Sequence, residues 1–344
     1  MVKTVFLLSG ENPDLSFAEL RHITRLTGGL KEPELVEQRI AVADIPAELH
    51  ERIVLRAAYT KLSAILLDMG ETPELAGGSV KLRPGWEKHV PMGLSFSVEV
   101  YGIGGMSYSS TELEKTVAEA VLGSDLGLRV DLENPDVRFV CVASPKVYAV
   151  GVLSALKPKH YFTSRRAKYK PFRTPSALQP KVARCLVNLA VSSMDSRVLD
   201  PFAGSGAVVV EAGLMGHEAV GVELKTWICE GMRRNTSYYC PATHHTVQGD
   251  ALTPPFTKAF DAVATDPPYG RSATLAGLDF KNLLRRFFEN IAPILRPKAR
   301  IAMSIPRESF EDLQACLESF KTLEYYDLYV HKSLTRRLVV LELV

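Results

Sequence analysis

The chain has 344 residues, of which 46% are hydrophobic and 23% are charged, and its formal net charge is +2. This length suits two or three domains, and the near balance of charges excludes a generally basic nucleic-acid coat protein. No run of 18 apolar residues is present, so we expect no membrane span. The five cysteines include no C-x-x-C pair, which favours reduced thiols in a cytoplasmic protein.

The first 155 residues predict a mixed α/β structure in two parts. The first part, residues 1–46, opens with a strand at 4–8 and an amphipathic helix that ends at Gly28 and Gly29. The second part, residues 47–155, begins with a helix near Ala47. Further strands are expected at 39–43, 62–69, 95–104, 137–144 and 146–154, and a further helix at 111–123.

A basic segment, residues 156–175, connects the two halves of the chain. It contains seven Lys or Arg side chains and no acidic one, with aromatic residues spaced among them. Cations can contact phosphates and aromatic rings can stack on bases, so the segment indicates contact with a nucleic acid. A solvated, charged hinge is the simpler alternative.

Residues 176–344 alternate strands and helices, as a Rossmann-like parallel sheet with crossover helices requires. The last two strands follow each other too closely for a helix between them, so we expect an antiparallel C-terminal hairpin in a seven-stranded sheet. The expected strands are 197–200, 218–223, 244–248, 260–265, 300–305, 322–331 and 335–343, and the expected helices are 177–192, 205–215, 225–238, 279–295 and 308–319.

A glycine turn follows the first of these strands, in RVLDPFAGSGAVVV. Gly204 and Gly206 would let the backbone approach a ligand at a helix N-terminus. A dinucleotide site is the alternative, but Val209 stands where that fingerprint needs its third glycine. Asp200 would be a poor neighbour for a pyrophosphate, whereas its carboxylate suits a ligand with an ammonium group.

Two more acidic residues follow the next two strands. Glu223 could accept both hydroxyls of a ribose, and Asp250 could accept from an adenine amino group. Each alone is more commonly a helix N-cap, but together with Asp200 they indicate an S-adenosylmethionine site at the carboxyl edge of the sheet. The turns that carry them add Phe202, Ala203, Leu224 and Ala251 to the expected cofactor contacts.

The fourth strand of this half ends in DPPYG. Asp266 offers only acceptors, and Pro267 and Pro268 stiffen the turn, so the turn suits an exocyclic amine on a planar ring. Hydrogen bonds to such acceptors favour a pyramidal nitrogen, and Asp266 could take its proton. Tyr269 supplies a face on which the ring can stack. A tight turn with a capping Asp is the alternative.

The series DPFAGSG, VGVEL, GD and DPPYG resembles the methyltransferases that act on nucleobase amines. The preceding KPFRTPSALQPKVAR resembles the motif that touches the methionine end of the cofactor in that family, which implies Phe172, Thr174 and Ser176 as further contacts. The motif alone does not separate adenine, guanine, cytosine or a glutamine amide as the target.

The segment GLRVDLENPDVRFVCV, residues 127–142, resembles the end of a THUMP domain. The resemblance implies a THUMP domain at 47–155, a ferredoxin-like domain at 1–46, and tRNA as the substrate. The whole chain is similar to tRNA guanine-N2 methyltransferases, most of all to the archaeal enzymes that act on guanine-10. Alternatives are a guanine-6 enzyme, a DNA adenine-N6 methyltransferase, and a non-catalytic RNA-binding protein.

Guanine-10 lies in a paired stem, so the resemblance also implies that the base is flipped into the pocket. We expect a monomer without a bound metal, and the resemblance leaves room for a small activating protein partner. One or two methyl groups could be added. The expected RNA contacts are Arg165, Arg166, Lys168, Lys170, Arg173 and Arg271.

Overall fold

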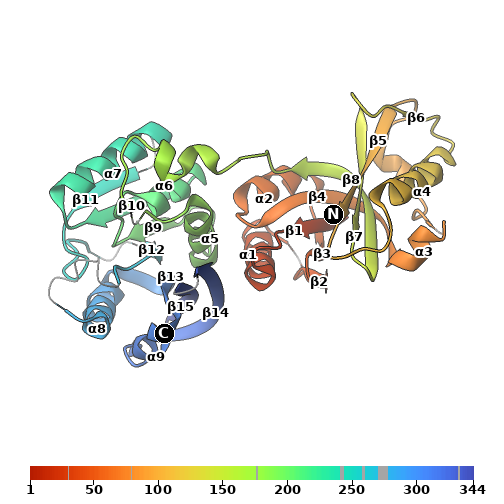
Figure 1. The fold of residues 1–344 in the computed structure, drawn as a ribbon. Coiled ribbons are helices and arrows are strands. Elements are labelled where there is room, and N and C mark those ends of the chain that lie inside the picture. Colours follow the sequence, from red (N-terminus) through yellow and green to blue (C-terminus); the bar gives the residue numbers. More distant parts are fainter. Residues whose placement is uncertain are drawn as a thin grey trace. The chain divides into compact units, whose positions relative to one another are not determined.

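The computed structural model describes residues 1–29, 31–78, 80–175, 177–240, 244–257, 260–269, 278–331 and 334–344. The chain divides into two compact units, Met1–Pro158 and Lys159–Val344 (Figure 1). No helix within the described residues has the length and apolar character needed to cross a bilayer.

One eight-stranded sheet runs through the whole first unit, in the order β2-β3-β1-β4-β8-β7-β5-β6. The long strands β4 and β8 pair with each other and join the part built on β1 to the part built on β7. The division of this unit at residue 46 into a ferredoxin-like and a THUMP domain stays a prediction. The elements are β1 (Val2–Leu8), α1 (Pro13–Leu26), β2 (Glu34–Glu37), β3 (Ile40–Ile45), η1 (Ala47–Leu49), α2 (His50–Arg56), β4 (Thr60–Glu71), α3 (Thr72–Ala76), η2 (Trp86–His89), β5 (Ser95–Gly102), α4 (Ser110–Leu122), β6 (Arg129–Val130), β7 (Val137–Ala143) and β8 (Val147–Leu156).

Local signals explain the two long helices of this unit. The Asn12 side chain accepts from Leu15 N at 3.2 Å and starts α1, while Ser109 and Glu112 form a capping box at the start of α4. Apolar side chains of α1 pack on β1 and β3, and those of α4 pack on β5 and β7. Burial of these faces holds both helices on the sheet.

The second unit is built on a seven-stranded sheet in the order β11-β10-β9-β12-β13-β15-β14. The strands β11, β10, β9, β12 and β13 pair in parallel, and β15 is antiparallel to both of its neighbours. The predicted sheet with its C-terminal hairpin is therefore confirmed. The elements are η3 (Thr163–Arg165), η4 (Ala167–Tyr169), α5 (Pro180–Ala190), β9 (Arg197–Asp200), α6 (Ala207–Leu214), β10 (Glu218–Glu223), α7 (Thr226–Tyr239), β11 (His244–Gln248), β12 (Phe260–Thr265), α8 (Phe280–Ile291), η5 (Ala292–Ile294), β13 (Leu295–Pro306), η6 (Arg307–Ser309), α9 (Phe310–Gln314), β14 (Phe320–His331) and β15 (Leu334–Leu343).

Helices cover both faces of this sheet (Figure 1). Val220 and Val222 of β10 pack in one core with side chains of α8, including Leu284 and Phe287. Gly221 lies between these valines. A Cβ built on it would meet the Val209 side chain of α6 at 2.6 Å and the Met232 sulfur of α7 at 2.7 Å. Since successive strand residues point to opposite faces, α6 and α7 cover one face and α8 the other.

Three expected helices differ from the structure by three or more residues at one end, two of them beside a proline. Helix α5 starts only at Pro180, since proline suits the first helical turn and disfavours a helical residue before it. Helix α8 ends at Ile291, shortly before Pro293, and α9 covers only 310–314 of the expected 308–319. The strands β2 and β6 were not predicted, because they are short and their residues are mostly exposed and lack apolar alternation.

The segment that follows Pro158 packs onto the second unit through buried charges. Glu211 of α6 is buried and accepts from Arg165 Nε at 2.6 Å and from Arg184 Nε of α5 at 2.7 Å. The hydroxyl of Tyr239, on α7, donates to Ser164 O at 2.6 Å. These contacts make residues 161–170 a fixed part of the unit.

Two of the expected RNA contacts are therefore buried side chains. Arg165 is 8% exposed and is paired with Glu211, and Lys170 is 3% exposed. Burial lowers the pKa of Lys170 to about 8. Both side chains are thus turned away from solvent in this structure, and their contact with RNA phosphates stays a prediction.

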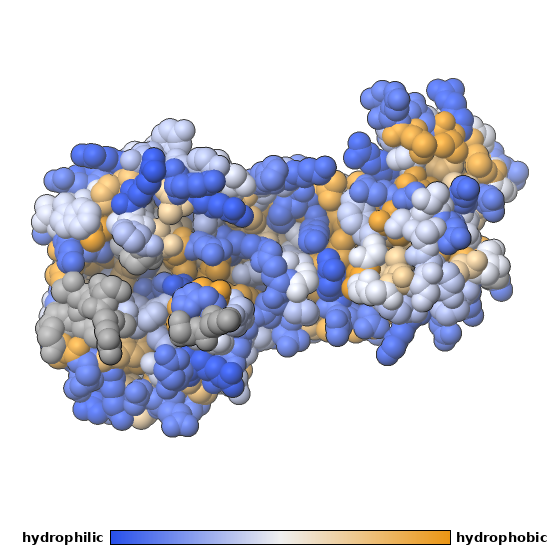
Figure 2. Space-filling model, in the orientation of Figure 1, coloured by the Kyte–Doolittle hydropathy of each residue, from blue (hydrophilic) through white to orange (hydrophobic). Residues whose placement is uncertain are grey.

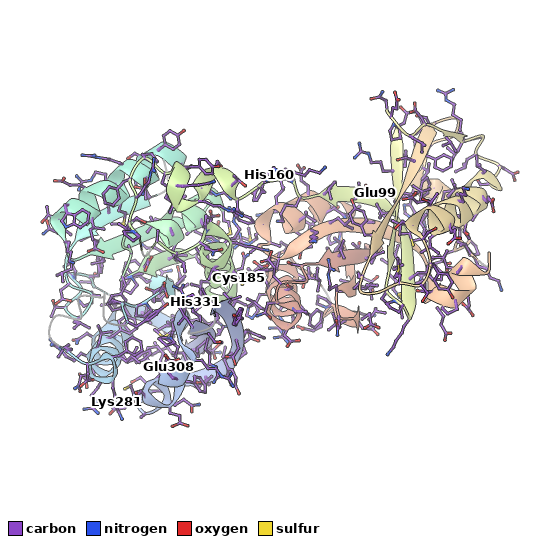
Figure 3. The ribbon with its side chains drawn as sticks, viewed as in Figure 1. Glu99, His160, Cys185, Lys281, Glu308 and His331 are labelled. Atoms are coloured by element: carbon purple, nitrogen blue, oxygen red, sulfur yellow. The ribbon has the colours of Figure 1, made fainter. Side chains whose placement is uncertain are left out.

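The five cysteines are buried and carry free thiols. Cys185, labelled in Figure 3, lies on α5. Burial raises the pKa of Cys141 to about 12 and that of Cys240 to about 11, so neither thiol is poised to react. Reduced thiols stay the expectation.

We expect Glu211→Gln to lower the free energy of unfolding by about 3 kcal/mol or more, because it leaves two buried guanidinium groups without their carboxylate. Denaturant unfolding followed by circular dichroism measures this. The control is Glu218→Gln, which removes an exposed partner of Arg197 at 2.9 Å and should cost less than about 1 kcal/mol. Equal costs for the two variants would contradict the structural role of Glu211.

Candidate active site

The carboxyl ends of four neighbouring parallel strands bring four acidic residues to one edge of the second unit's sheet. Asp200 is the last residue of β9 and Glu223 the last of β10, while Asp250 and Asp266 follow β11 and β12. Cross-strand registers such as Gly221↔Asp200 and Glu223↔Gln248 align these ends. The expected cluster of carboxylates at one edge therefore forms, at the edge where open parallel sheets bind ligands.

The glycine turn after β9 needs its glycines for two different reasons. Gly204 has φ +50° and Gly206 has φ +82°, in the left-handed region that L side chains rarely adopt. A Cβ on Gly206 would meet Met232 Cγ of α7 at 2.8 Å, whereas a Cβ on Gly204 would meet nothing within 4 Å. Gly206 thus permits close packing of α7, and Gly204 borders open space that a ligand can use.

Asp200 is buried beneath this turn. Its Oδ1 accepts from the Thr265 hydroxyl at 2.7 Å and from Phe202 N at 3.2 Å. Burial raises the pKa of Asp200 to about 7, against the effect of these hydrogen bonds, and the charges of Asp266 and Glu223 add to the rise. A bound cation would reverse that effect, so this carboxyl suits an ammonium group.

Glu223 accepts backbone N–H groups on both carboxylate oxygens. Gly204 N donates to Oε2 at 3.1 Å and Lys225 N to Oε1 at 2.9 Å, so the carboxylate orients the glycine turn. Each oxygen keeps a lone pair for a further donor such as a ribose hydroxyl. The next residue, Leu224, is 47% exposed and can cover such a ligand.

Asp250 caps the turn after β11 and is half-buried. Its Oδ1 accepts from Leu252 N at 2.9 Å, and Ala251 between them is buried. Together with Asp200, Glu223 and the open space at Gly204, this donor and acceptor set fits S-adenosylmethionine.

Phe172 is held beside the glycine turn by a residue that the sequence did not single out, Asn235 of α7. Phe172 N donates to Asn235 Oδ1 at 2.9 Å, and Asn235 Nδ2 donates to Phe172 O at 3.0 Å and to Ser205 O at 2.9 Å. The Phe172 ring fills the space over Gly231 and meets Trp227 edge-on at 5.9 Å. Thr174 is half-buried nearby in sequence, and Ser176 lies outside the described residues.

The DPPY turn presents Asp266 and Tyr269 at the same edge. Burial raises the pKa of Asp266 to about 6, against the effect of the Arg336 cation, whose Nη1 donates to Asp266 Oδ2 at 3.2 Å. The other carboxylate oxygen, Oδ1, is buried and makes no hydrogen bond of ordinary geometry with a described residue, although the nearby Ser304 hydroxyl also lowers the pKa of this carboxyl. Pro267 is buried and Pro268 half-buried, so the turn is backed by packing as well as by fixed φ angles.

Tyr269 is flanked by an aromatic ring and a guanidinium group. Phe280, the first residue of α8, meets its ring edge-on at 6.4 Å, and Arg336 Cζ lies 5.6 Å from the ring centroid. Burial raises the pKa of Tyr269 to about 12, so its hydroxyl stays protonated, and this buried hydroxyl has no described partner. An acceptor, an aromatic ring and an unmatched hydroxyl therefore gather in one turn.

The other expected RNA contacts divide by position. Arg166, Lys168 and Arg173 are exposed on the segment that packs beside α7, and Arg271 lies outside the described residues. Trp227 and Tyr238 of α7 are 58% and 70% exposed. Hydrophilic side chains gather over α7 and this segment in Figure 2.

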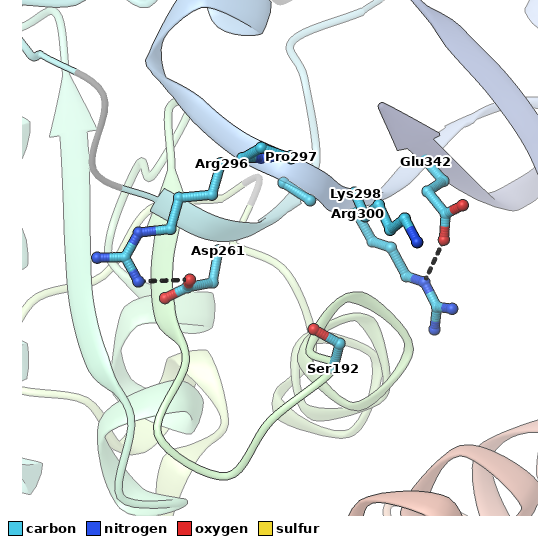
Figure 4. Close-up of a pocket in the computed structure, with 8 residues that line it drawn as sticks. Ser192, Asp261, Arg296, Pro297, Lys298, Arg300 and Glu342 are labelled. Carbon is cyan, nitrogen blue, oxygen red and sulfur yellow. Dashed lines mark hydrogen bonds and ion pairs between the residues drawn. The ribbon is translucent and has the colours of Figure 1, made fainter. Parts of the chain in front are cut away.

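A shallow pocket at the opposite edge of the sheet is not a candidate site (Figure 4). It lies where β12 and β13 begin, and apart from Lys298 the charged side chains that line it are paired with each other. Arg296 Nη1 donates to Asp261 Oδ1 at 2.8 Å, and Arg300 Nε donates to Glu342 Oε2 at 3.2 Å.

Two domain families match the chain. An RMKL-like methyltransferase domain matches residues 167–337, and a THUMP domain matches residues 83–148.

Curated relatives cover the whole chain. It is 32% identical to the tRNA (guanine(10)-N2)-dimethyltransferase of Methanothermobacter thermautotrophicus over 100% of both chains, and 30% identical to that of Pyrococcus abyssi over 96% of both. It is also 28% identical to the tRNA (guanine(6)-N2)-methyltransferase of Thermus thermophilus over 61% of both.

Solved structures share the fold. The crystal structure of TrmN from Thermus thermophilus covers 99% of this chain and 100% of its own, with TM-score 0.57 and 22% identity. That of SMU.472 in complex with SAH covers 98% of this chain and 97% of its own, with TM-score 0.53 and 15% identity. With matches along its full length and both domain families in place, the chain belongs to the tRNA (guanine(10)-N2)-dimethyltransferase family.

Proposed function

We propose that this protein methylates the exocyclic N2 amine of guanine-10 in tRNA, with S-adenosylmethionine as the methyl donor. The observation that carries the proposal is the unmatched acceptor Asp266 Oδ1, buried in a DPPY turn beside three other strand-end carboxylates. The two full-length relatives, which are tRNA (guanine(10)-N2)-dimethyltransferases, support guanine-10 and the addition of two methyl groups. Mass spectrometry of the methylated nucleotide in tRNA treated with the enzyme tests this directly.

The cofactor would be held by the carboxylates and the glycine turn. Asp200 would face the ammonium group, Glu223 the ribose hydroxyls and Asp250 the adenine amine, while Phe202, Ala203, Gly204, Gly206, Leu224 and Ala251 line the turns between them. Phe172, Thr174 and Ser176 belong to the same predicted set. When bound, S-adenosylmethionine supplies a methyl group already activated on a sulfonium.

Asp266 and the two prolines orient the amine. The N2 lone pair of guanine is delocalised into the ring, and a hydrogen bond from N2–H to Asp266 Oδ1 favours a pyramidal nitrogen whose lone pair is available. The Pro267 carbonyl offers a second acceptor in the same rigid turn. As positive charge grows on the nitrogen, Asp266 stabilises it and takes the proton, since its raised pKa of about 6 makes it a better base than a solvated aspartate.

Tyr269 holds the base. Its ring offers a face on which a flipped purine can stack, and its position directly after the acceptors fixes the plane of the ring relative to Asp266. The protein's main contribution is this orientation of a bound base, which can supply several kcal/mol of the barrier reduction.

We expect the affinity for S-adenosylmethionine to depend on Asp200. Since the pKa of Asp200 is raised to about 7, the carboxyl is protonated below that pH and loses its attraction for an ammonium group. Affinity measured by calorimetry should therefore fall as pH drops from 7.5 to 5.5, by up to about tenfold per pH unit. Asp200→Asn should bind weakly and remove this dependence, whereas Asp195→Asn, exposed before β9, should retain it. Constant wild-type affinity over this range would contradict the role.

We expect Asp266→Asn to lower methyl transfer by about 100-fold or more, because an amide cannot take the proton. The affinity for S-adenosylmethionine should change less than about twofold, since the loss concerns the amine. The control is Asp261→Asn, on the same strand at the opposite edge of the sheet. Single-turnover transfer of labelled methyl groups measures both, and an Asp266→Asn enzyme with wild-type turnover would remove Asp266 from this role.

The exposed cations beside α7 are the proposed tRNA contact on this unit. Arg166, Lys168 and Arg173 can each neutralise a phosphate, and the exposed rings of Trp227 and Tyr238 suit packing against bases or sugars. Arg271 remains part of the predicted set.

We expect the triple variant Arg166→Ala, Lys168→Ala, Arg173→Ala to weaken tRNA binding and to reduce the slope of log Kd against log salt by about 3. A control triple variant, Arg296→Ala, Lys298→Ala, Lys321→Ala, removes as many cations from the start of β13 and β14, at the opposite edge. Filter binding across salt concentrations measures both slopes. Equal reductions in the two variants would exclude a localised contact.

Guanine-6 is the second candidate target, since a guanine-6 enzyme is 28% identical over 61% of both chains. The same mass spectrometric mapping separates the two positions, and a non-catalytic RNA-binding protein would transfer no label. A cytoplasmic monomer remains our prediction, as does a small activating protein partner, and light scattering after size-exclusion chromatography tests the oligomeric state.

A further inference from the structure

Arg336 reaches the candidate active site because of the one antiparallel strand in the sheet. β15 runs against β13, so its first residues pair with the last residues of β13, in the register Pro306↔Arg336. The start of β15 therefore lies at the edge where β9, β10 and β12 end. A fully parallel sheet would place this residue at the opposite edge.

The contacts of Arg336 join the two functional side chains of the DPPY turn. Its Nη1 donates to Asp266 Oδ2 at 3.2 Å, with the two side chains 18% and 15% exposed. Its Cζ lies 5.6 Å from the centre of the Tyr269 ring, within the range of a cation–π contact. One guanidinium group thus fixes both the acceptor and the ring.

The pairing leaves a particular set of polar atoms unmatched. Asp266 Oδ1, Tyr269 Oη, Arg336 Nε and Ser304 Oγ are buried, and none makes a hydrogen bond of ordinary geometry with a described residue. The Ser304 hydroxyl nevertheless lies close enough to Asp266 to lower its pKa, and Arg336 does the same for the pKa of Tyr269. A buried polar atom without a partner costs about 1–3 kcal/mol, and a bound base with donors and acceptors on its edge would match such atoms. Because Arg336 holds Oδ2 and not Oδ1, one carboxylate oxygen stays available.

We propose that Arg336 is a positioning residue for methyl transfer: it holds Asp266 through Oδ2, leaves Oδ1 to the guanine amine, and fixes the Tyr269 ring. This inference rests on the proposed function. According to this inference, a residue of the C-terminal hairpin, outside the DPPY motif, orients that motif.

The charged groups around Asp266 have opposing effects. Asp200, on β9, and Asp266 interact unfavourably as like charges, and Glu223 adds its charge at Asp200. Tyr269 stays neutral, and the charge of Glu308 acts on Tyr269. Arg336 is the cation that lowers the pKa of Asp266 against burial, so its removal should raise that pKa and move the acidic limb of the rate profile to higher pH.

The test compares Arg336→Gln and Arg336→Lys with a matched control, Arg337→Gln. Arg337 is the next residue and points to the other face of β15. It pairs with Asp327 at 2.7 and 3.0 Å, and its Cζ lies 4.6 Å from the Phe310 ring centroid and 4.5 Å from that of Tyr325. Its loss removes a comparable ion pair and ring contact away from Asp266. Melting temperatures of all variants report any common loss of stability.

For Arg336→Gln we expect kcat to fall about tenfold or more. The acidic limb of its pH profile should shift upward by about one pH unit, and the affinity for S-adenosylmethionine should change less than about twofold. Arg336→Lys should restore the acidic limb of the pH profile through its charge. It should restore only part of kcat, because an ammonium lacks the planar guanidinium group that contacts both Asp266 and Tyr269. Arg337→Gln should leave kcat and the limb unchanged.

An increase in kcat for Arg336→Gln would show that Arg336 competes with the amine and would overturn the proposal, as would unchanged kcat and limb. A change equal to that of Arg337→Gln would also overturn it. If the wild-type protein methylates no tRNA, the proposed function fails, and the Arg336 inference is still decided by nuclear magnetic resonance titration of the Asp266 carboxyl carbon. Its pKa should rise in Arg336→Gln, and an unchanged pKa would overturn the inference.

Discussion

A carboxylate that leaves water needs a cation or hydrogen-bond donors, and the second unit assembles four carboxylates at one sheet edge. Parallel pairing of β9, β10, β11 and β12 makes this assembly unavoidable, since each of these strands ends at or just before an acidic residue. Backbone N–H groups satisfy Glu223 and Asp250, and the Thr265 hydroxyl satisfies part of Asp200. The acceptor oxygens that remain without a donor are those that can bind a cationic ligand and an amine.

The antiparallel hairpin supplies the cation that one of these carboxylates needs. Asp266 is the most isolated of the four carboxylates from backbone donors, and it receives a guanidinium group from β15. The hairpin therefore does more than extend the sheet, because its strand direction determines which of its residues reach the carboxyl edge. The site is therefore assembled from the ends of the parallel strands and from the C-terminal hairpin.

Much of the second unit could be predicted because its signals are local. The strands at 197–200, 218–223 and 260–265 have apolar centres, the strand at 244–248 lies at the expected spacing between the last two, and the ends of all four carry the motifs. Asn235 and Arg336 could not be found this way, since one depends on the packing of α7 against residue 172 and the other on strand register. Arg165 and Arg166 are neighbours in the same basic run, and only the distant Glu211 decides that the first is buried. In the first unit, the short strands β2 and β6 left no pattern to detect.

Asn235 connects the basic segment, which carries the proposed tRNA contacts, to the glycine turn of the proposed cofactor site. Its side chain is fully buried and bonds both to the backbone of residue 172, in the basic segment, and to the backbone of Ser205, in the glycine turn. A ligand that orders one of these backbone segments also lowers the conformational entropy of the other, so a second ligand that binds there has less ordering left to do. Thermodynamic reciprocity then requires that whatever cofactor occupancy does to nucleic-acid affinity, nucleic-acid occupancy does to cofactor affinity by the same factor.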